Sequence, residues 1–297
     1  MATLRELKGR IGSVASSEKI TGAMKMISSA KMHKAETILR RLSPFRDCVQ
    51  SIIANLLSSD AVVSSPLTEP HQHVGTVGIV VLGSDDGLCG AYNVNIFKFM
   101  LTHIASLREK YGQDVAIEIF PVGKKVAKAV LKLMEKDRNV TVCQEIDVTS
   151  KSEGDDVKTF GIEFESRFIG GTIDRVDVVY MRFISPGRQI ATAEEYLPVS
   201  QEALSTENAG KSSQPYLFEP DASSIFGTVL PMYLLSKMQE AFCQNRASEQ
   251  AARVMAMQSA NDNAQKLLEQ LQLEYNKLRQ QGITTELLDI VGGQARD

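Results

Sequence analysis

A glycine-rich segment, GSDDGLCG at residues 83–90, has the residue types of a phosphate-binding turn. It follows a short apolar run at residues 77–82 and precedes a segment with helical spacing, which is where such turns lie. Its glycines match neither G-x-G-x-x-G nor G-K-S/T, and the adjacent Asp85 and Asp86 would repel a phosphate. We interpret the segment as a structural turn and keep a nucleotide site as the alternative.

Histidine and cysteine side chains are the other candidates for chemistry. His71 and His73 lie in a proline-flanked loop, a setting typical of a solvated turn rather than of a metal site. The four cysteines lie far apart, with no CxxC pair, at Cys48, Cys89, Cys143 and Cys243. We interpret them as small apolar core residues, because neither a disulfide framework nor a zinc site has such spacing.

The composition excludes several classes of protein. The 297 residues include 33 Lys plus Arg and 36 Asp plus Glu, so the net charge is −3 and the basic surplus typical of nucleic-acid binders is missing. The most apolar stretch is far shorter than the roughly 20 residues that span a bilayer. The first ten residues lack the apolar core of a signal peptide. We expect a chain that is made in the cytoplasm, stays soluble and binds no nucleic acid.

The first element that could position any site is a long helix at residues 1–57. Its apolar residues recur at spacings of three and four, at Leu4, Leu7, Ile11, Val14, Ile20, Met24 and Ile27, and later at Ala35, Ile38, Leu42, Phe45, Val49, Ile52 and Leu56. This spacing predicts a coiled-coil seam. A slip between Val14 and Ile20 is expected to change the winding locally, and Pro44 is expected to kink the helix without ending it.

Charge is unevenly distributed between this helix and the rest of the chain. Residues 1–57 hold ten basic and four acidic residues, a net charge of +6, so the other 240 residues carry −9. A solvated helix surface is the simplest interpretation of such a basic face.

Strand-like and helix-like segments alternate after a linker at residues 58–73. The strand-like runs lie at 77–82, 115–120 and 175–184, and the helix-like runs at 94–109, 124–135 and 155–168. This order indicates a mostly parallel sheet with both faces covered. We therefore predict a Rossmann-like α/β domain at residues 74–200, followed by a second linker at 201–214.

A second long helix is predicted at residues 215–297, with Pro231 near its start. Sixty-odd helical residues would be roughly 100 Å long, more than one small domain can bury. Residues 247–264 are rich in alanine, and a four-three apolar repeat follows at Ala264, Leu268, Leu271, Tyr275 and Leu278. The two terminal helices can bury their stripes by forming an antiparallel two-helix coiled coil, with the α/β domain inserted between them.

Four motifs, in order along the chain, resemble the γ subunit of the rotary F-type ATP synthase. They are EKITGAMKMISSAKM at 18–32, GSDDGLCGAYN at 83–93, YLFEPD at 216–221 and ASEQAARVMAMQSANDNAQKLLEQLQLEYNKLRQQGITTELLDIVG at 247–292. The resemblance covers nearly the whole chain. This family normally has Arg where this chain has Asp86, so the resemblance assigns no role to that side chain.

The resemblance implies a rotor shaft without an active site, cofactor or metal of its own. The coiled coil would sit inside a ring of three α and three β subunits, and the α/β domain would join the ε subunit and the membrane ring of c subunits. Proton flow would turn the membrane c ring, and this chain would be a peripheral membrane protein on the cytoplasmic side of a bacterial inner membrane. The basic first helix would then be attracted to acidic loops of the surrounding α and β subunits over ~8 Å.

Family positions also imply contacts between rotor and stator. The residues that match them are Met24, Arg253, Gln280 and Thr284, which we expect to touch β. Arg253 would donate several hydrogen bonds to an acidic loop, and Gln280 and Thr284 would make neutral ones that exchange as the shaft turns. The alternatives are coiled-coil core for Met24 and ordinary helix-end surface for the last two.

Tyr216 and Glu219 match positions that touch the polar loops of the c ring, although packing within their own loop would also explain them. Two other classes of function stay open. One is a nucleotide-using enzyme with GSDDGLCG as its loop, and the other is a coiled-coil scaffold unrelated to energy conversion.

Overall fold

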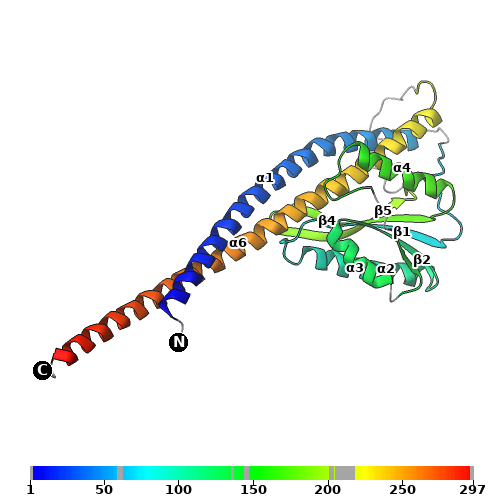
Figure 1. The fold of residues 1–297 in the computed structure, drawn as a ribbon. Helices are drawn as coiled ribbons and strands as arrows, with labels where there is room; N and C mark the ends of the chain where they lie inside the picture. Colours follow the sequence, from blue (N-terminus) through cyan, green and yellow to red (C-terminus); the bar gives the residue numbers. More distant parts are fainter. Residues whose placement is uncertain are drawn as a thin grey trace. The chain divides into compact units, whose positions relative to one another are not determined.

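A computed structural model describes residues 3–58, 63–134, 137–143, 147–200, 204 and 218–294. Two long helices, α1 (Leu4–Leu57) and α6 (Ala222–Gln294), flank the other elements in sequence (Figure 1). Between them lie β1 (Thr76–Leu82), α2 (Tyr92–Tyr111), β2 (Ala116–Val122), α3 (Lys124–Met134), β3 (Val140–Val142), α4 (Asp155–Ile169), β4 (Arg175–Ser185) and β5 (Arg188–Leu197). The predicted order of helix, α/β domain and helix is confirmed.

The chain packs into two compact units. One comprises Met1–Ser29 with Arg253–Asp297, and the other comprises Ala30–Ala252. Segments of both long helices therefore belong to the same unit as the sheet. The domain boundaries proposed from the sequence, at residues 57, 74, 200 and 215, stay predictions.

The second unit is built on a five-stranded sheet in the order β3-β2-β1-β4-β5. Four strands are parallel, and β5 is antiparallel to β4, so the mostly parallel sheet is confirmed. The sequence did not predict β3 or β5. The first has only three residues, and the second mixes charged with apolar residues. Because β5 lies at the edge and runs antiparallel, it does not need the continuous apolar pattern of a central parallel strand.

Side chains of each strand alternate between two cores. From β1, Ile79 and Val81 face the core formed with α2 and α3. Val80 and Leu82 face the opposite core, formed with α4 and the segments of α1 and α6 that belong to this unit. Figure 1 shows these two layers of helices on the two faces of the sheet. The sheet is thus covered on both sides, as the near-continuous apolar strands predict.

In this unit the predicted stripe of α1 is partly wrong. Val49 and Leu56 are buried as expected, but Phe45 and Ile52 are 50% and 40% exposed. Ile53, fully buried, takes the place of Ile52. The buried residues keep the four-three alternation of a helix packed on one side, which a stripe drawn through the largest apolar residues misses.

The cysteines are core residues with one exception, and all four are free. Cys89 and Cys243 are buried and Cys143 is half-buried. Burial raises the pKa of the Cys243 thiol to about 11 and also raises that of Cys143. Cys48 is exposed, so the expectation of a core position is wrong there. It lies beside buried Val49 on the outer side of α1.

The loop before β1 is hydrogen-bonded to Asp174, the residue that precedes β4. This corrects the expectation of a solvated turn for His71. The ring of His71 stacks on Phe168 with centroids 4.6 Å apart, and its Nδ1 lies 2.8 Å from Asp174 Oδ1. The backbone N–H groups of Gly75 and Thr76 donate to Asp174 Oδ2 over 2.9 Å each. Within the described residues, no group of three or more His, Cys, Asp or Glu side chains could hold a metal ion.

In the Asp174→Asn variant, the free energy of unfolding should fall less steeply with decreasing pH than in the wild type. Burial favours the protonated carboxyl, but hydrogen bonds from His71, Thr76 and Gly75 outweigh it and lower the pKa of Asp174. The carboxylate therefore stabilises the fold above the unfolded pKa of about 4, and this contribution is lost as pH falls through the lower folded pKa. Urea unfolding of the full chain as a function of pH checks this. Asp114 is exposed, so the free energy of unfolding of Asp114→Asn should fall in acid as steeply as that of the wild type. An equally steep fall in Asp174→Asn would contradict the expectation.

In the first unit, α1 and α6 lie side by side and run in opposite directions (Figure 1). Thr21 of α1 lies 3.3 Å from Asn261 of α6, measured between Oγ1 and Oδ1. Nearer the start of α1, a hollow is lined by Val14 together with Leu267 and Leu271. Residue numbers rise along α6 as they fall along α1, so the predicted antiparallel pairing is confirmed.

The seam of α1 in this unit is regular, and it is polar after Val14, which corrects two expectations. Buried or half-buried side chains recur at intervals of four and three, at Leu7, Ile11, Val14, Glu18, Thr21, Lys25 and Ser28. There is no slip after Val14, and the apolar residues assigned to the stripe, Ile20 and Ile27, are 60% and 56% exposed. Coiled-coil geometry sets the register here, and polar side chains such as Thr21 occupy it where a partner, here Asn261, is in reach.

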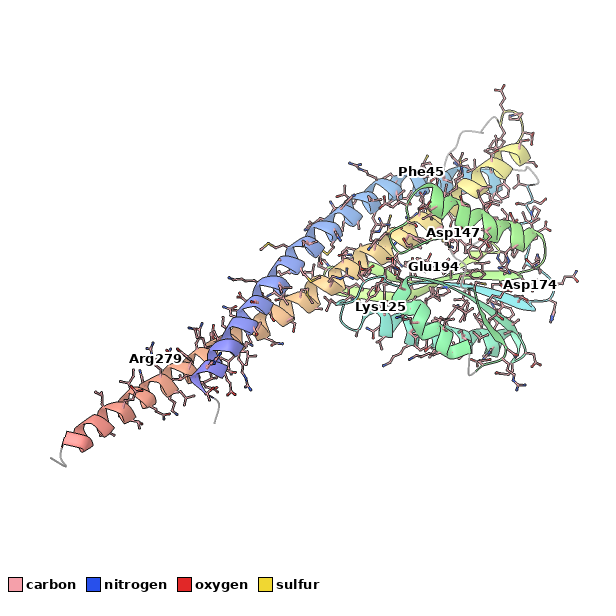
Figure 2. The ribbon with its side chains drawn as sticks, viewed as in Figure 1. Phe45, Lys125, Asp147, Asp174, Glu194 and Arg279 are labelled. Atoms are coloured by element: carbon pink, nitrogen blue, oxygen red, sulfur yellow. The ribbon has the colours of Figure 1, made fainter. Side chains whose placement is uncertain are left out.

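The seam of α6 in this unit follows the predicted repeat. Each of its five residues is less exposed than those between them, namely Ala264, Leu268, Leu271, Tyr275 and Leu278. The helix then extends beyond the start of α1, and side chains around Arg279 project outward from it (Figure 2). This last stretch of α6 is therefore open to contact along most of its surface.

Candidate functional site

The residues expected to contact a stator are placed separately along the helices. Met24 is half-buried beside the seam of α1, not in the exposed stripe of Ile20 and Ile27 with which it was grouped. Gln280 and Thr284 are exposed on the last part of α6, where the Thr284 hydroxyl donates to the Gln280 carbonyl over 2.9 Å. From Asn261, level with Thr21 of α1, to Gln280 is roughly 30 Å along the helix at 1.5 Å per residue. The structure does not bring these residues together.

Arg253 differs from the other three because it is only 5% exposed. It stands at the end of a run of α6 in which polar side chains are buried, including Ser248, Glu249 and Gln250. This burial leaves little of the side chain open to another chain. The assignment of Arg253 to the stator contact remains a prediction.

The start of α6 is capped by Asp221. Its Oδ1 accepts from the backbone N–H of Ser224 over 2.8 Å, and its Oδ2 accepts from the Ser224 hydroxyl over 2.7 Å. These bonds lower the pKa of the exposed Asp221 carboxyl, as expected at a helix N-terminus. Glu219 is exposed just before this cap, whereas Tyr216 lies outside the described residues.

The glycine-rich turn between β1 and α2 uses its polar groups internally. Asp85 Oδ1 accepts from the backbone N–H of Lys124 over 3.1 Å, and its Oδ2 accepts from the hydroxyl and backbone N–H of Ser150 over 2.7 and 3.2 Å. Asp86 forms an exposed ion pair with Lys151 at 3.0 Å, which raises the pKa of Lys151. The turn thus connects β1 to the first residue of α3 and to the segment before α4, and its two carboxylates give it the wrong charge for a phosphate.

A row of polar side chains on α6 reaches the sheet in the second unit. Lys237 Nζ donates to the Glu195 carbonyl of β5, and the Ser248 hydroxyl donates to the Met181 carbonyl of β4 over 2.8 Å. Asn245 Nδ2 donates to the carbonyl of Gly83 over 3.0 Å. These side chains form a polar seat for α6 on β5, on β4 and on the turn that follows β1.

Charges line the same seat. Glu194 of β5, labelled in Figure 2, accepts from the Tyr180 hydroxyl over 2.6 Å, and Arg46 of α1 forms an ion pair with Glu240 of α6. Burial raises the pKa of Tyr180 well above its usual value, with the nearby Glu194 as a further cause. Burial also lowers the pKa of Lys237, although surrounding carboxylates oppose this. Arg46 and Glu240 are paired, and Lys237 and Glu194 have hydrogen-bond partners, as burial of charged groups requires.

The sequence did not predict this seat, because residues 244–250 are mostly polar and carry no apolar repeat. The structure buries Gln244, Asn245, Ser248, Glu249 and Gln250, each at most 9% exposed. One signal could have found them. The small residues Ala247 and Ala251, both fully buried, are spaced so that another backbone can approach the helix closely.

None of the described helices has the length and apolar content needed to span a bilayer.

Comparison with known proteins identifies the relatives of this chain. The sequence profile described as ATP synthase matches residues 3–295. The ATP synthase gamma chain of Bacteroides thetaiotaomicron is 39% identical over 302 residues, which cover 99% of each chain. The ATP synthase gamma chain of Polynucleobacter asymbioticus is 34% identical, again over 99% of each chain.

Solved structures agree on the fold. The rotor of the Euglena gracilis mitochondrial ATP synthase in rotational state 1 superposes with a TM-score of 0.58 at 18% identity, over 94% of this chain and 98% of that one. A chain of the central stalk and c ring of the Tetrahymena thermophila mitochondrial ATP synthase gives a TM-score of 0.53 at 21% identity, over 81% and 99%. With sequence relatives that match over their full length, the chain belongs to the ATP synthase gamma chain family.

Proposed function

We propose that this chain is the central rotor shaft of a proton-translocating F-type ATP synthase and is not itself catalytic. The observation that carries the proposal is the match to gamma chains over 99% of the sequence, combined with an antiparallel helix pair. The pair turns inside the ring of α and β subunits. The α/β domain joins the ε subunit and the membrane c ring, so rotation of the ring reaches the nucleotide sites of β.

The surface of the helix pair suits a turning shaft. Its large exposed apolar side chains are spread over both helices, at Leu4, Ile20, Met26, Ile27, Met255, Leu267, Leu273, Ile283, Leu287 and Leu288. Single apolar side chains make non-directional contacts, which change little as the shaft turns. These apolar side chains are distributed along both helices rather than gathered into one anchor.

Electrostatic attraction adds a contact that also needs no fixed fit. In the first unit, Arg5, Lys8, Arg10 and Lys19 of α1 are exposed. Facing acidic loops of the ring, they attract it over ~8 Å at physiological salt. The chain is held as a peripheral membrane protein through the c ring, on the cytoplasmic side of the bacterial cell membrane.

The contacts that depend on angle are assigned to the family positions. Met24, Gln280 and Thr284 touch β, with Arg253 joining them after a change of side-chain conformation. Tyr216 and Glu219 touch the polar loops of the c ring. What supports these assignments is similarity of position, together with the partial or full exposure of Met24, Glu219, Gln280 and Thr284.

Met24→Lys should reduce coupling while leaving assembly intact. The half-buried side chain lies beside the seam, so a lysine can extend its ammonium outward without disturbing the pair. An added cation near an acidic loop resists rotation at one angle, and we expect ATP-driven proton pumping to fall by about half. Pumping and ATP hydrolysis in inverted membrane vesicles measure this, with Met24→Leu as the control. Unchanged coupling in the lysine variant would remove Met24 from the contacts.

Purification tests the proposed function itself. The full chain, isolated with a mild detergent from its native membrane, should bring down α, β, ε and c subunits in an ATP-hydrolysing complex. A chain recovered without α and β subunits would favour a scaffold unrelated to energy conversion, and micromolar binding of ATP by the isolated chain would favour an enzyme.

A further inference from the structure

A buried polar cluster joins α6 to the glycine-rich turn. Asn245 and Tyr92 are 2% and 3% exposed. The Tyr92 hydroxyl lies 2.5 Å from Asn245 Oδ1 and 3.0 Å from the Asn245 carbonyl, and Asn245 Nδ2 donates to the Gly83 carbonyl over 3.0 Å. One side chain of α6 is therefore bonded at both ends of its amide, once to the turn and once to the first residue of α2.

The Gly83 carbonyl is held in place by close packing. Gly83 donates its N–H to the Val122 carbonyl over 2.8 Å, and a Cβ on Gly83 would lie 2.6 Å from Val126 Cγ1. Gly123 has φ +110°, and a Cβ there would come within 3.0 Å of the Gly83 and Ser84 backbone. Neither glycine can be replaced without shifting the turn, so the acceptor that meets Asn245 has little freedom to move.

A second bond on the same face of α6 meets the neighbouring strand. Ser248, three residues after Asn245, donates to the Met181 carbonyl over 2.8 Å. Val81 of β1 pairs with Val179 of β4, so Gly83 and Met181 stand at the same level of two adjacent parallel strands. Positions three apart share one face of a helix, and this face of α6 therefore contacts both the turn that follows β1 and the middle of β4.

Directional bonds of this kind resist a different motion from apolar contacts. Apolar packing opposes separation of two surfaces, but it is non-directional and opposes sliding or twisting less. A hydrogen bond to a fixed carbonyl requires a distance near 3 Å and good alignment, so a small twist of the helix breaks it.

We propose that Asn245 is a positioning residue that locks α6 against twist in the glycine-rich turn, so that torque on the α/β domain passes to the shaft helix without slip. This inference rests on the proposed function and extends it. The glycine-rich turn, which has the residue types of a phosphate site, instead binds the shaft helix α6. Its carbonyl, not its N–H groups, makes the contact.

The test uses the assembled complex in inverted membrane vesicles, with Asn245→Ala compared with Asn95→Ala. Asn95 is exposed on α2, three residues from Tyr92, and controls for loss of an amide in the same region. At equal amounts of assembled complex, Asn245→Ala should hydrolyse ATP at the wild-type rate but pump about half as many protons per ATP, and the deficit should grow with the opposing proton gradient. A role in folding alone would lower the yield of complex without changing this ratio.

Tyr92→Phe provides a second, gentler variant in case Asn245→Ala does not assemble. It keeps the buried ring and removes the hydroxyl that orients the amide, so it should show the same load-dependent deficit at smaller size. A wild-type ratio of protons to ATP under load in either assembled variant would overturn the inference. A wild-type complex that pumps no protons on ATP hydrolysis would instead count against the proposed function, so the two failures are distinguishable.

Discussion

Asp177→Ala is expected to lower the free energy of unfolding by about 3 kcal/mol, because it leaves a buried guanidinium without its main partner. Asp177 is 1% exposed in β4. Its Oδ1 lies 2.9 Å from Arg175 Nη2, and its Oδ2 accepts from Arg175 Nε over 3.1 Å. The same Oδ2 lies 2.8 Å from His103 Nε2. Burial by itself lowers the pKa of Arg175, and the charges of Asp177 and Glu195 more than reverse this.

Urea unfolding of the full chain measures the effect. Arg175 keeps Glu195 at 3.0 Å and Tyr111 at 3.1 Å, which places the expected loss at the lower end of the range for a broken buried ion pair. Asp114→Ala, at an exposed position, is the matched control. A loss below about 1 kcal/mol for Asp177→Ala would mean that this pair behaves like a surface ion pair.

Phe164→Ala is expected to cost about 3–5 kcal/mol, since it opens a cavity in the core between α4 and the sheet. Phe164 is fully buried, and its ring meets those of Phe120 and Phe160 edge to face, each with centroids 4.8 Å apart. Such ring pairs add to the energy of burial.

Denaturant unfolding checks this prediction against Ile162→Ala on the same helix. Ile162 is 47% exposed, so its truncation should change stability by less than about 1 kcal/mol. A similar loss for both variants would contradict the assignment of Phe164 to the centre of this core. The proton-to-ATP ratio is not the readout here, because the substitution acts on folding.

The sheet was predictable from sequence where its strands are central. The runs at β1, β2 and β4 are apolar on both faces because helices cover both, and such runs are visible without any contact information. The edge strands were not, since β5 is half-covered and β3 is short. Edge strands owe their existence to a neighbour, which one stretch of sequence does not record.

The helix pair was predictable in kind but not in register. The repeat ending at Tyr275 and Leu278 located the seam of α6 correctly. On α1 the large apolar residues Ile20 and Ile27 drew the stripe to the wrong face, because the true seam there passes through Thr21 and Lys25. Hydrophobic periodicity identifies a seam only where its residues are apolar.

The seat of α6 on the sheet was the least predictable part. Asn245 and Ser248 are polar residues in a helix, and their sequence context is the same as that of a solvated surface. They are buried because the Asn245 amide donates to a carbonyl of the glycine-rich turn and the Ser248 hydroxyl donates to a carbonyl of β4. That pairing depends on tertiary structure, so it becomes visible only when the sheet and helix are placed together.

Direct observation of rotation tests the central claim. The complex would be fixed to a surface through its β subunits, and a fluorescent probe would be attached to Ala105→Cys, exposed on α2, with exposed Cys48 replaced by Ser. On addition of ATP the probe should rotate in one direction relative to β. A complex that hydrolyses ATP while the probe keeps a fixed orientation would contradict the assignment of this chain as the rotor.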